Sequence, residues 1–161
     1  MYLAKKSILL AVFLLAGNVP GMAQVEKVAM RTVRLSCGMC AVFSEMYLRG
    51  LPSIDQIIIS KSKEAVMITY KPGAQFQPSD IRSALKKTEV GVEQFQIAAR
   101  GHVQEEGGTQ FFVAGKDKFL LVFSPNSPKV PTGISLSIEG IVNDAKNPME
   151  LKVLTFKTLQ K

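Results

Sequence analysis

Apolar and polar residues follow two different periods along the first hundred residues, and the two periods predict strands and helices. Alternating β-branched runs favour strands, whereas apolar residues three or four positions apart favour helices. The predicted strands are residues 28–35, 54–60, 65–70 and 92–99, and the predicted helices are residues 41–51 and a second helix that begins at Pro78. Pro52 ends the first helix, and Pro78 suits the first turn of the second because that turn needs no backbone donor.

These elements follow one another as strand, helix, strand, strand, helix, strand over residues 26–100. This order is the split βαβ arrangement, in which an antiparallel sheet carries two helices on one face. The pattern therefore predicts an α+β fold that starts with a ferredoxin-like βαββαβ domain.

The pattern changes from Gly101 onward, where helical spacing disappears and short β-prone runs follow one another. The runs are residues 109–113, 118–123, 134–142 and 150–157, and glycine, proline and asparagine residues separate them. With a further strand around Arg100-Gly101-His102-Val103, about five strands fit a small barrel that loosely resembles an OB-like fold. We therefore expect a separate all-β domain at residues 101–161, although such a fold by itself gives no function.

The first residues have the composition of a secretory signal peptide. Lys5 and Lys6 precede an unbroken apolar run, residues 8–16, and small residues follow at the positions that a signal peptidase reads. We expect residues 1–23 to be removed before Gln24, which predicts a periplasmic or secreted protein. A membrane anchor is the alternative, but a helix that spans a bilayer needs roughly 20 apolar residues.

The net charge of +7 does not by itself indicate a binding partner. Removal of Lys5 and Lys6 would leave +5, and the remaining positive residues are scattered rather than interleaved with aromatic residues. The sequence therefore predicts no nucleic-acid partner and, after cleavage, no stable membrane insertion. Phe111, Phe112, Phe119, Phe123 and Phe156 could form a stacking platform, but strand spacing favours a core role.

The candidate chemistry lies in the only two cysteines, Cys37 and Cys40, which are separated by Gly38-Met39 and lie between a strand and a helix. The free N–H groups and the dipole of a first helical turn favour a thiolate there. Two thiolates suit soft ions such as Cu(I) or Hg(II), whereas structural zinc usually takes four ligands. His102 is the only histidine and is more often a surface residue than a ligand at such a place. We expect Gly38 to let the loop bend, and Met39 to be an exposed loop residue whose thioether could assist a soft ion.

Residues 28–99 resemble a heavy-metal-associated domain, the family of copper metallochaperones and periplasmic mercury-binding proteins. The resemblance rests on Leu35-Ser36-Cys37-Gly38-Met39-Cys40 and on Leu48, Leu51, Pro52 and Ile54 at the family's spacing. It implies a non-enzymatic protein in which Cys37 and Cys40 bind Cu(I), or Hg(II), Zn(II) or Cd(II), and pass the ion to a metal-transporting or metal-accepting protein. Three departures stand out: Leu35 replaces a methionine, Ser44 an apolar residue, and Thr88-Glu89-Val90-Gly91 lacks the family's tyrosine or lysine.

Two other functions stay open. A C-x-x-C at a helix start is also the arrangement of thiol–disulfide redox proteins, although no aromatic residue precedes Cys37. Alternatively, Cys37 and Cys40 form a local disulfide and the β-rich part binds a protein partner. The sequence contains no catalytic triad, phosphate loop or dinucleotide fingerprint, so we expect no enzyme activity.

Overall fold

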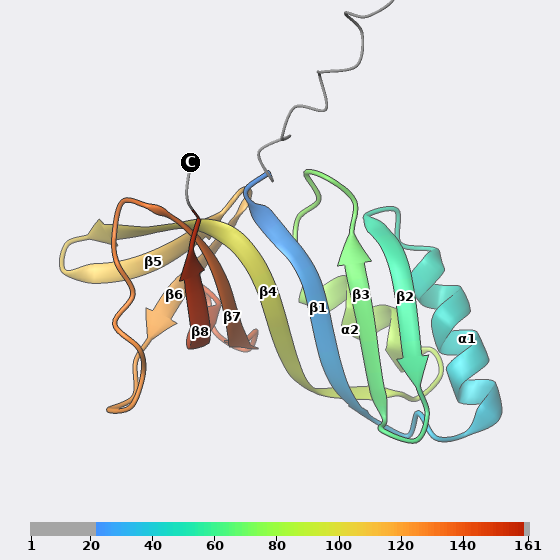
Figure 1. The fold of residues 1–161 in the computed structure, drawn as a ribbon. Helices are drawn as coiled ribbons and strands as arrows, with labels where there is room; N and C mark the ends of the chain where they lie inside the picture. The colour runs from blue at the N-terminus through green and yellow to red at the C-terminus, as the bar shows by residue number, and fades with distance from the viewer. Residues whose placement is uncertain (1–21, 160–161) are drawn as a thin grey trace, which may run out of the picture.

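Eight strands and two helices make up residues 22–159, the part of the chain that the computed structural model describes (Figure 1). They are β1 (Gln24–Val33), α1 (Gly38–Arg49), β2 (Ile54–Ser60), β3 (Ala65–Tyr70), α2 (Pro78–Lys86), β4 (Gly91–Glu106), β5 (Thr109–Ala114), β6 (Asp117–Val122), β7 (Ser135–Asn143) and β8 (Glu150–Thr158). β2 and β3 have the bounds that the sequence predicts, whereas β4 continues well beyond its predicted end.

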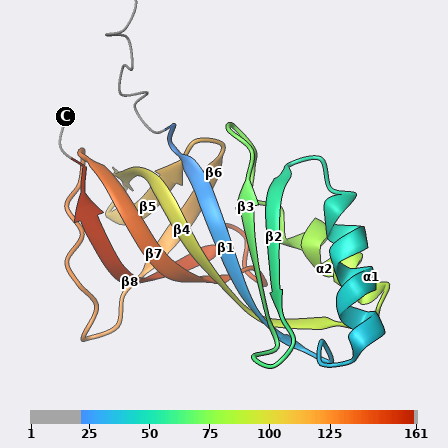
Figure 2. The same ribbon diagram turned by 45° about the vertical axis from the view of Figure 1, so that its right-hand side comes forward.

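All eight strands belong to one sheet, in the order β2-β3-β1-β4-β5-β6-β8-β7. A further pairing of β4 with β7 closes β4, β5, β6, β8 and β7 into a five-stranded barrel (Figures 1 and 2). Neighbouring strands are antiparallel except β6 and β8, which are parallel. β1, β3 and β2 extend away from the barrel, and α1 and α2 lie together beside this extension.

The predicted fold class, an α+β ferredoxin-like βαββαβ domain followed by a small all-β OB-like domain, is wrong. The described chain is mostly strand with only two helices. No separate ferredoxin-like domain is evident, because β1, β2 and β3 belong to the same sheet as the barrel and are joined to it through β4. β4 is the shared element, since its residues 91–100 pair with β1, its residues 102–106 pair with β5, and its residues 95–102 pair with β7.

Gly101 explains why composition suggested a break where the strand continues. A Cβ atom at Gly101 would lie within van der Waals overlap of the Val113 carbonyl on β5. Glycine inside a strand commonly marks such a close backbone approach rather than the end of the strand. β4 therefore crosses the expected boundary between residues 100 and 101, and independent folding of residues 26–100 and 101–161 stays a prediction.

The buried residues of the extension and the barrel form one continuous core. Phe76, in the loop between β3 and α2, links the two parts because its ring packs edge-on against Phe95, with centroids 5.6 Å apart, and lies 6.3 Å from the Phe119 ring in β6. Face-to-edge contacts between aromatic rings add to the stabilisation that burial gives. The barrel and the helix-bearing part are therefore packed against each other through aromatic side chains.

The predicted signal peptide, residues 1–23, lies outside the described residues except for Met22 and Ala23, so it stays a prediction. β1 begins at Gln24, the residue before which cleavage is expected. Neither helix of the described part has the length and apolar character that crossing a membrane requires.

Candidate functional site

The cysteine turn, residues 34–40, connects the end of β1 to the start of α1. β1 is anchored at that end by Thr32, which is buried and donates from both its backbone N and its Oγ1 to the Glu64 carbonyl in the β2–β3 turn, at 2.8 and 2.7 Å. The chain then reverses at Arg34, whose φ of 68° lies in the left-handed region. Leu35 is fully buried in the core, so its apolar side chain anchors the turn to the core.

Cys37 is the N-cap residue of α1, and Cys40 lies in its first turn. The Cys40 backbone N–H donates to Cys37 Sγ at 3.0 Å, and the Ala41 N–H donates to the Cys37 carbonyl at 3.2 Å. A cap of this kind satisfies one of the free N–H groups at a helix start. The first turn, Gly38-Met39-Cys40-Ala41, carries no acidic side chain, so the positive end of the helix dipole faces the sulfur atoms uncompensated.

The two sulfur atoms are joined as a disulfide, with the Cα atoms 5.1 Å apart. Cys37 is exposed and Cys40 is half-buried, so the pair lies at the surface rather than in the core. Within residues 22–159, no group of three or more histidine, cysteine, aspartate or glutamate side chains gathers here or elsewhere. Among histidine, cysteine and carboxylate side chains, the described residues therefore offer only these two sulfur atoms at this place.

Two expectations about the residues between the cysteines need correction. Gly38 does not adopt a positive φ, and a Cβ atom there would meet nothing within 4 Å, so the bend at Arg34 does what was expected of Gly38. Met39 belongs to the helix rather than to a loop, and its side chain is 61% exposed.

Met39 is also the first member of an exposed apolar stripe on α1 that sequence reasoning missed. Met39, Val42, Phe43 and Met46 follow one another at helical spacing and all are exposed, while Ala41, Ser44 and Leu48 are buried on the opposite side. The spacing of three and four residues predicts the helix, but it does not indicate which of the apolar side chains stay exposed. The surface beside the cysteines is thus apolar.

Ser44 places a polar side chain on the buried side of α1, and a hydrogen bond satisfies its hydroxyl. Its hydroxyl is fully buried and lies 2.9 Å from Thr88 Oγ1, which donates to the Leu85 carbonyl at 2.9 Å. A buried hydroxyl with a partner avoids most of the cost of burial. Ser44 and Thr88 therefore join α1 to the end of α2 by a hydrogen bond.

The other residues singled out from the sequence lie away from this turn or in the core. His102 is exposed in the middle of β4, where it pairs with Val113 and Ser135 in the barrel. Phe112 and Phe119 are fully buried opposite each other on β5 and β6, and Phe123 is exposed. The phenylalanines therefore do not share one stacking surface.

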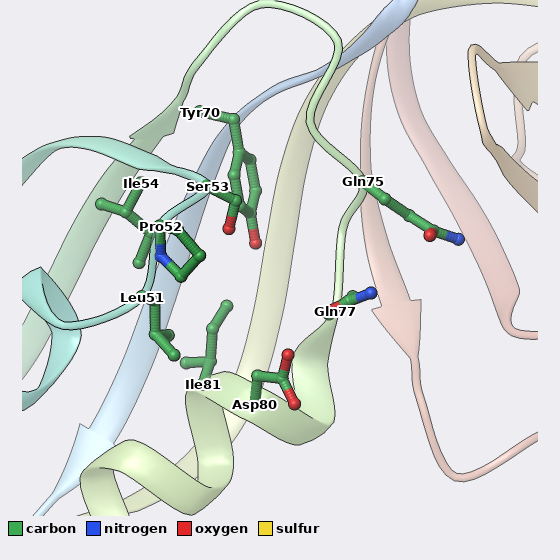
Figure 3. A pocket seen from close by; sticks show the side chains of 9 residues that line it. All are labelled: Leu51, Pro52, Ser53, Ile54, Tyr70, Gln75, Gln77, Asp80 and Ile81. Carbon is green, nitrogen blue, oxygen red and sulfur yellow. The ribbon is translucent and has the colours of Figure 1, made fainter.

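A small pocket of about 140 Å³ lies at the other end of α1, between the chain that follows this helix and the start of α2 (Figure 3). Burial raises the pKa of Tyr70, whose ring lines the pocket together with Asp80 and Gln77. α1 has 12 residues and is therefore about 18 Å long at 1.5 Å per residue, and neither cysteine lines the pocket. The pocket is therefore not part of the cysteine site.

Comparison with known proteins gives little further support. No protein family matches the chain, and no curated protein matches it either. Among solved structures the chain is similar to a CopZ metallochaperone, at 17% identity and a TM-score of 0.37, over 41% of this chain and 97% of that one. A similarity this weak carries no argument about the family, so the chemistry of this chain is inferred from its own residues.

Proposed function

We propose that the reduced protein binds one soft metal ion, with Cu(I) preferred, between the thiolates of Cys37 and Cys40 and passes it to another protein. The observation that carries the proposal is the exposed pair of sulfur atoms at the start of α1, within bonding reach of each other. The same pair would accept Hg(II), and it suits Zn(II) or Cd(II) less well because those ions prefer more ligands.

The two sulfur ligands suit a soft ion that the protein passes on, rather than one that it binds permanently. Two thiolates satisfy Cu(I). Within residues 22–159, no histidine or carboxylate joins the two cysteines as a third ligand, so the ion stays open to an incoming ligand. The N–H group of Cys40 and the start of α1 stabilise negative charge on Cys37 Sγ. Since the disulfide offers no thiolate, binding belongs to the reduced form, in which Cys37 and Cys40 act together.

The partner in this proposal is a metal-transporting or metal-accepting protein, and the site of action is outside the cytoplasm. Transfer takes place by ligand exchange, in which a thiolate or thioether of the partner joins the ion before one cysteine leaves. The exposed Met39 thioether lies in the same first turn and is the nearest soft group in the sequence to both cysteines. No enzyme activity is needed for this function.

An anaerobic Cu(I) titration against a competing chelator tests the proposal. The fully reduced protein is compared with the variant that combines Cys37→Ser and Cys40→Ser. One tightly bound ion per chain is expected, and the double variant is expected to lose at least about a thousandfold in affinity. Equal, weak binding by both proteins would overturn the proposal.

A thiol–disulfide redox function is the second candidate, and the observation that favours it is the disulfide between Cys37 and Cys40 itself. A redox protein needs the two cysteines in different roles, since one attacks the substrate disulfide and the other resolves the mixed disulfide. Cys40→Ser should then trap a mixed disulfide with a substrate, whereas Cys37→Ser should not. A metal carrier instead predicts that either single variant loses metal binding and that neither traps a substrate.

A further inference from the structure

β2 is the edge strand of the eight-stranded sheet, and its outer side is unpaired. It pairs with β3 on one side only, from Ile54 to Ser60. Within residues 22–159, no backbone hydrogen bond joins the outer side of residues 56–60 to another element. An open row of N–H and C=O groups is a template for another strand, so the occupant that this edge fits is a strand.

The centre of β2 lacks the features by which edge strands usually resist pairing. Residues 56–60 carry neither charge nor proline, and Ile57, Ile58 and Ile59 occupy the middle. The one irregularity is a bulge at Asp55, which leaves the pairing from Gln56 to Ser60 regular. Proteins commonly protect such edges with lysine, proline or a central bulge.

Ile58 lies on the side of the sheet that the helices leave open. Its side chain is 56% exposed, and it is in register with Met67 on β3, which in turn is in register with Ala29 on β1. These three residues form an apolar row that ends at the exposed Ile58. A strand added beside β2 would bury that end.

The sequence of β2 and its flanks is complementary to itself when read in opposite directions. If two copies of Asp55-Gln56-Ile57-Ile58-Ile59-Ser60-Lys61 lie antiparallel and centred on Ile58, each Ile58 faces the other and each Ile57 faces an Ile59. Asp55, at the bulge, then lies near Lys61 of the other copy, which is the first residue after β2. Opposite charges at facing positions stabilise a strand pair, and like charges destabilise it.

We propose that two copies of this chain pair through their β2 edges across a twofold axis at Ile58, which joins the two sheets into one. An interface of this kind is self-complementary, so every contact away from the axis occurs twice. Because a single pair of short strands buries little area, the dimer forms reversibly, with a dissociation constant in the micromolar range of about 10 μM. The proposal does not depend on metal binding.

Sedimentation of the purified protein from low micromolar to near-millimolar concentration tests the pairing. A reductant and a metal chelator are present, so that neither Cys37 nor a shared ion can join two chains. The wild-type protein should change from monomer to dimer across this range. Ile58→Lys places two lysines at the axis and should raise the dissociation constant at least about tenfold. The matched control is Ile134→Lys, just before β7, since Ile134 is also exposed, at 44%, and this change should leave dimerisation unchanged.

Reversal of the end charges tests the register. Asp55→Lys alone and Lys61→Asp alone put like charges at both ends of the interface, and each should weaken the homodimer. An equimolar mixture of the two single variants restores opposite charges at both ends, so it should form a heterodimer about as well as the wild-type protein forms its homodimer. A wild-type protein that stays monomeric, a dimer that Ile58→Lys leaves intact, or a mixture that does not recover would each overturn the proposal.

Discussion

The cysteine turn and the loop between β3 and α2 are fixed by the same kind of contact and differ in what surrounds it. In the cysteine turn, Cys37 Sγ accepts from the Cys40 N–H at the protein surface. In the loop, residues 71–77, Gln24 Oε1 accepts from the Gly73 N–H at 2.6 Å and Asp117 Oδ2 accepts from the Phe76 N–H at 2.9 Å. Gln24 and Asp117 are both buried.

The difference shows how exposure decides what an acceptor can do. Asp117 on β6 joins this loop to the barrel, whereas Gln24 on β1 holds the loop within the helix-bearing part, and both acceptors are buried away from solvent. Asp117 Oδ1 has no hydrogen-bond partner within the described residues, and burial raises the pKa of Asp117 from its ordinary 3.8 to about 6, against the lowering effect of the Phe76 N–H. The exposed sulfur of Cys37 caps a helix and remains open to reaction. The loop should therefore determine stability, and the cysteine turn should determine chemistry.

The largest expected effect is the loss of stability on replacing Phe76, the buried residue of the loop. Phe76→Ala removes a ring that packs against Phe95 and Phe119 and should lower the free energy of unfolding by roughly 3–5 kcal/mol. Urea unfolding measures this change. Phe123→Ala is the control, because Phe123 is 46% exposed and its loss should cost no more than about 1 kcal/mol. Similar losses for both variants would contradict a loop that joins the two parts.

Asp117 should make the free energy of unfolding depend on pH. Because its pKa is raised in the folded protein, the folded state binds more protons than the unfolded state between the two pKa values. Stability from this group is therefore full below about pH 4, falls as the pH rises, and is constant above the folded pKa of about 6. The shift corresponds to roughly 3 kcal/mol.

Asp117→Asn removes this titration, and its amide oxygen can still accept from the Phe76 N–H. The free energy of unfolding of the wild-type protein should fall relative to that of Asp117→Asn as the pH rises from 4 to 7, by up to roughly 3 kcal/mol. Urea unfolding of both proteins across that range measures the difference. A difference that is the same at every pH would contradict the assignment to Asp117.

The smallest effect is expected in the cysteine turn, where stability and chemistry should separate. In the reduced state, Cys37→Ser keeps an acceptor at the N-cap and should change the free energy of unfolding by less than about 0.5 kcal/mol. Cys37→Ala removes the cap and should be about 1 kcal/mol less stable than Cys37→Ser. Thermal unfolding under reductant compares them. A large loss with Cys37→Ser would show that the sulfur itself stabilises the fold.

Local sequence patterns predicted most of the helices and strands. They failed at glycines, because a glycine can fill more than one structural role. The β-prone runs located β2 and β3 to the residue, and the proline at position 78 located the start of α2. Gly101 was interpreted as a boundary, whereas it permits close contact between β4 and β5. Gly38 was interpreted as the bend of the cysteine turn, whereas Arg34 makes it. Sequence alone does not distinguish a glycine that ends a strand from one that lets two backbones approach.

The sequence by itself determined where the strands and helices form and which two side chains carry the candidate chemistry, because both depend on residues close together in the chain. Only the tertiary structure decided that all eight strands share one sheet, that Asp117 and Gln24 hold the same loop, and that the Met39 stripe is exposed. These features depend on contacts between residues far apart in sequence. Strand pairing and burial depend on how the whole chain packs. The spacing of apolar residues predicts that an element has an apolar face, but it does not predict what covers that face.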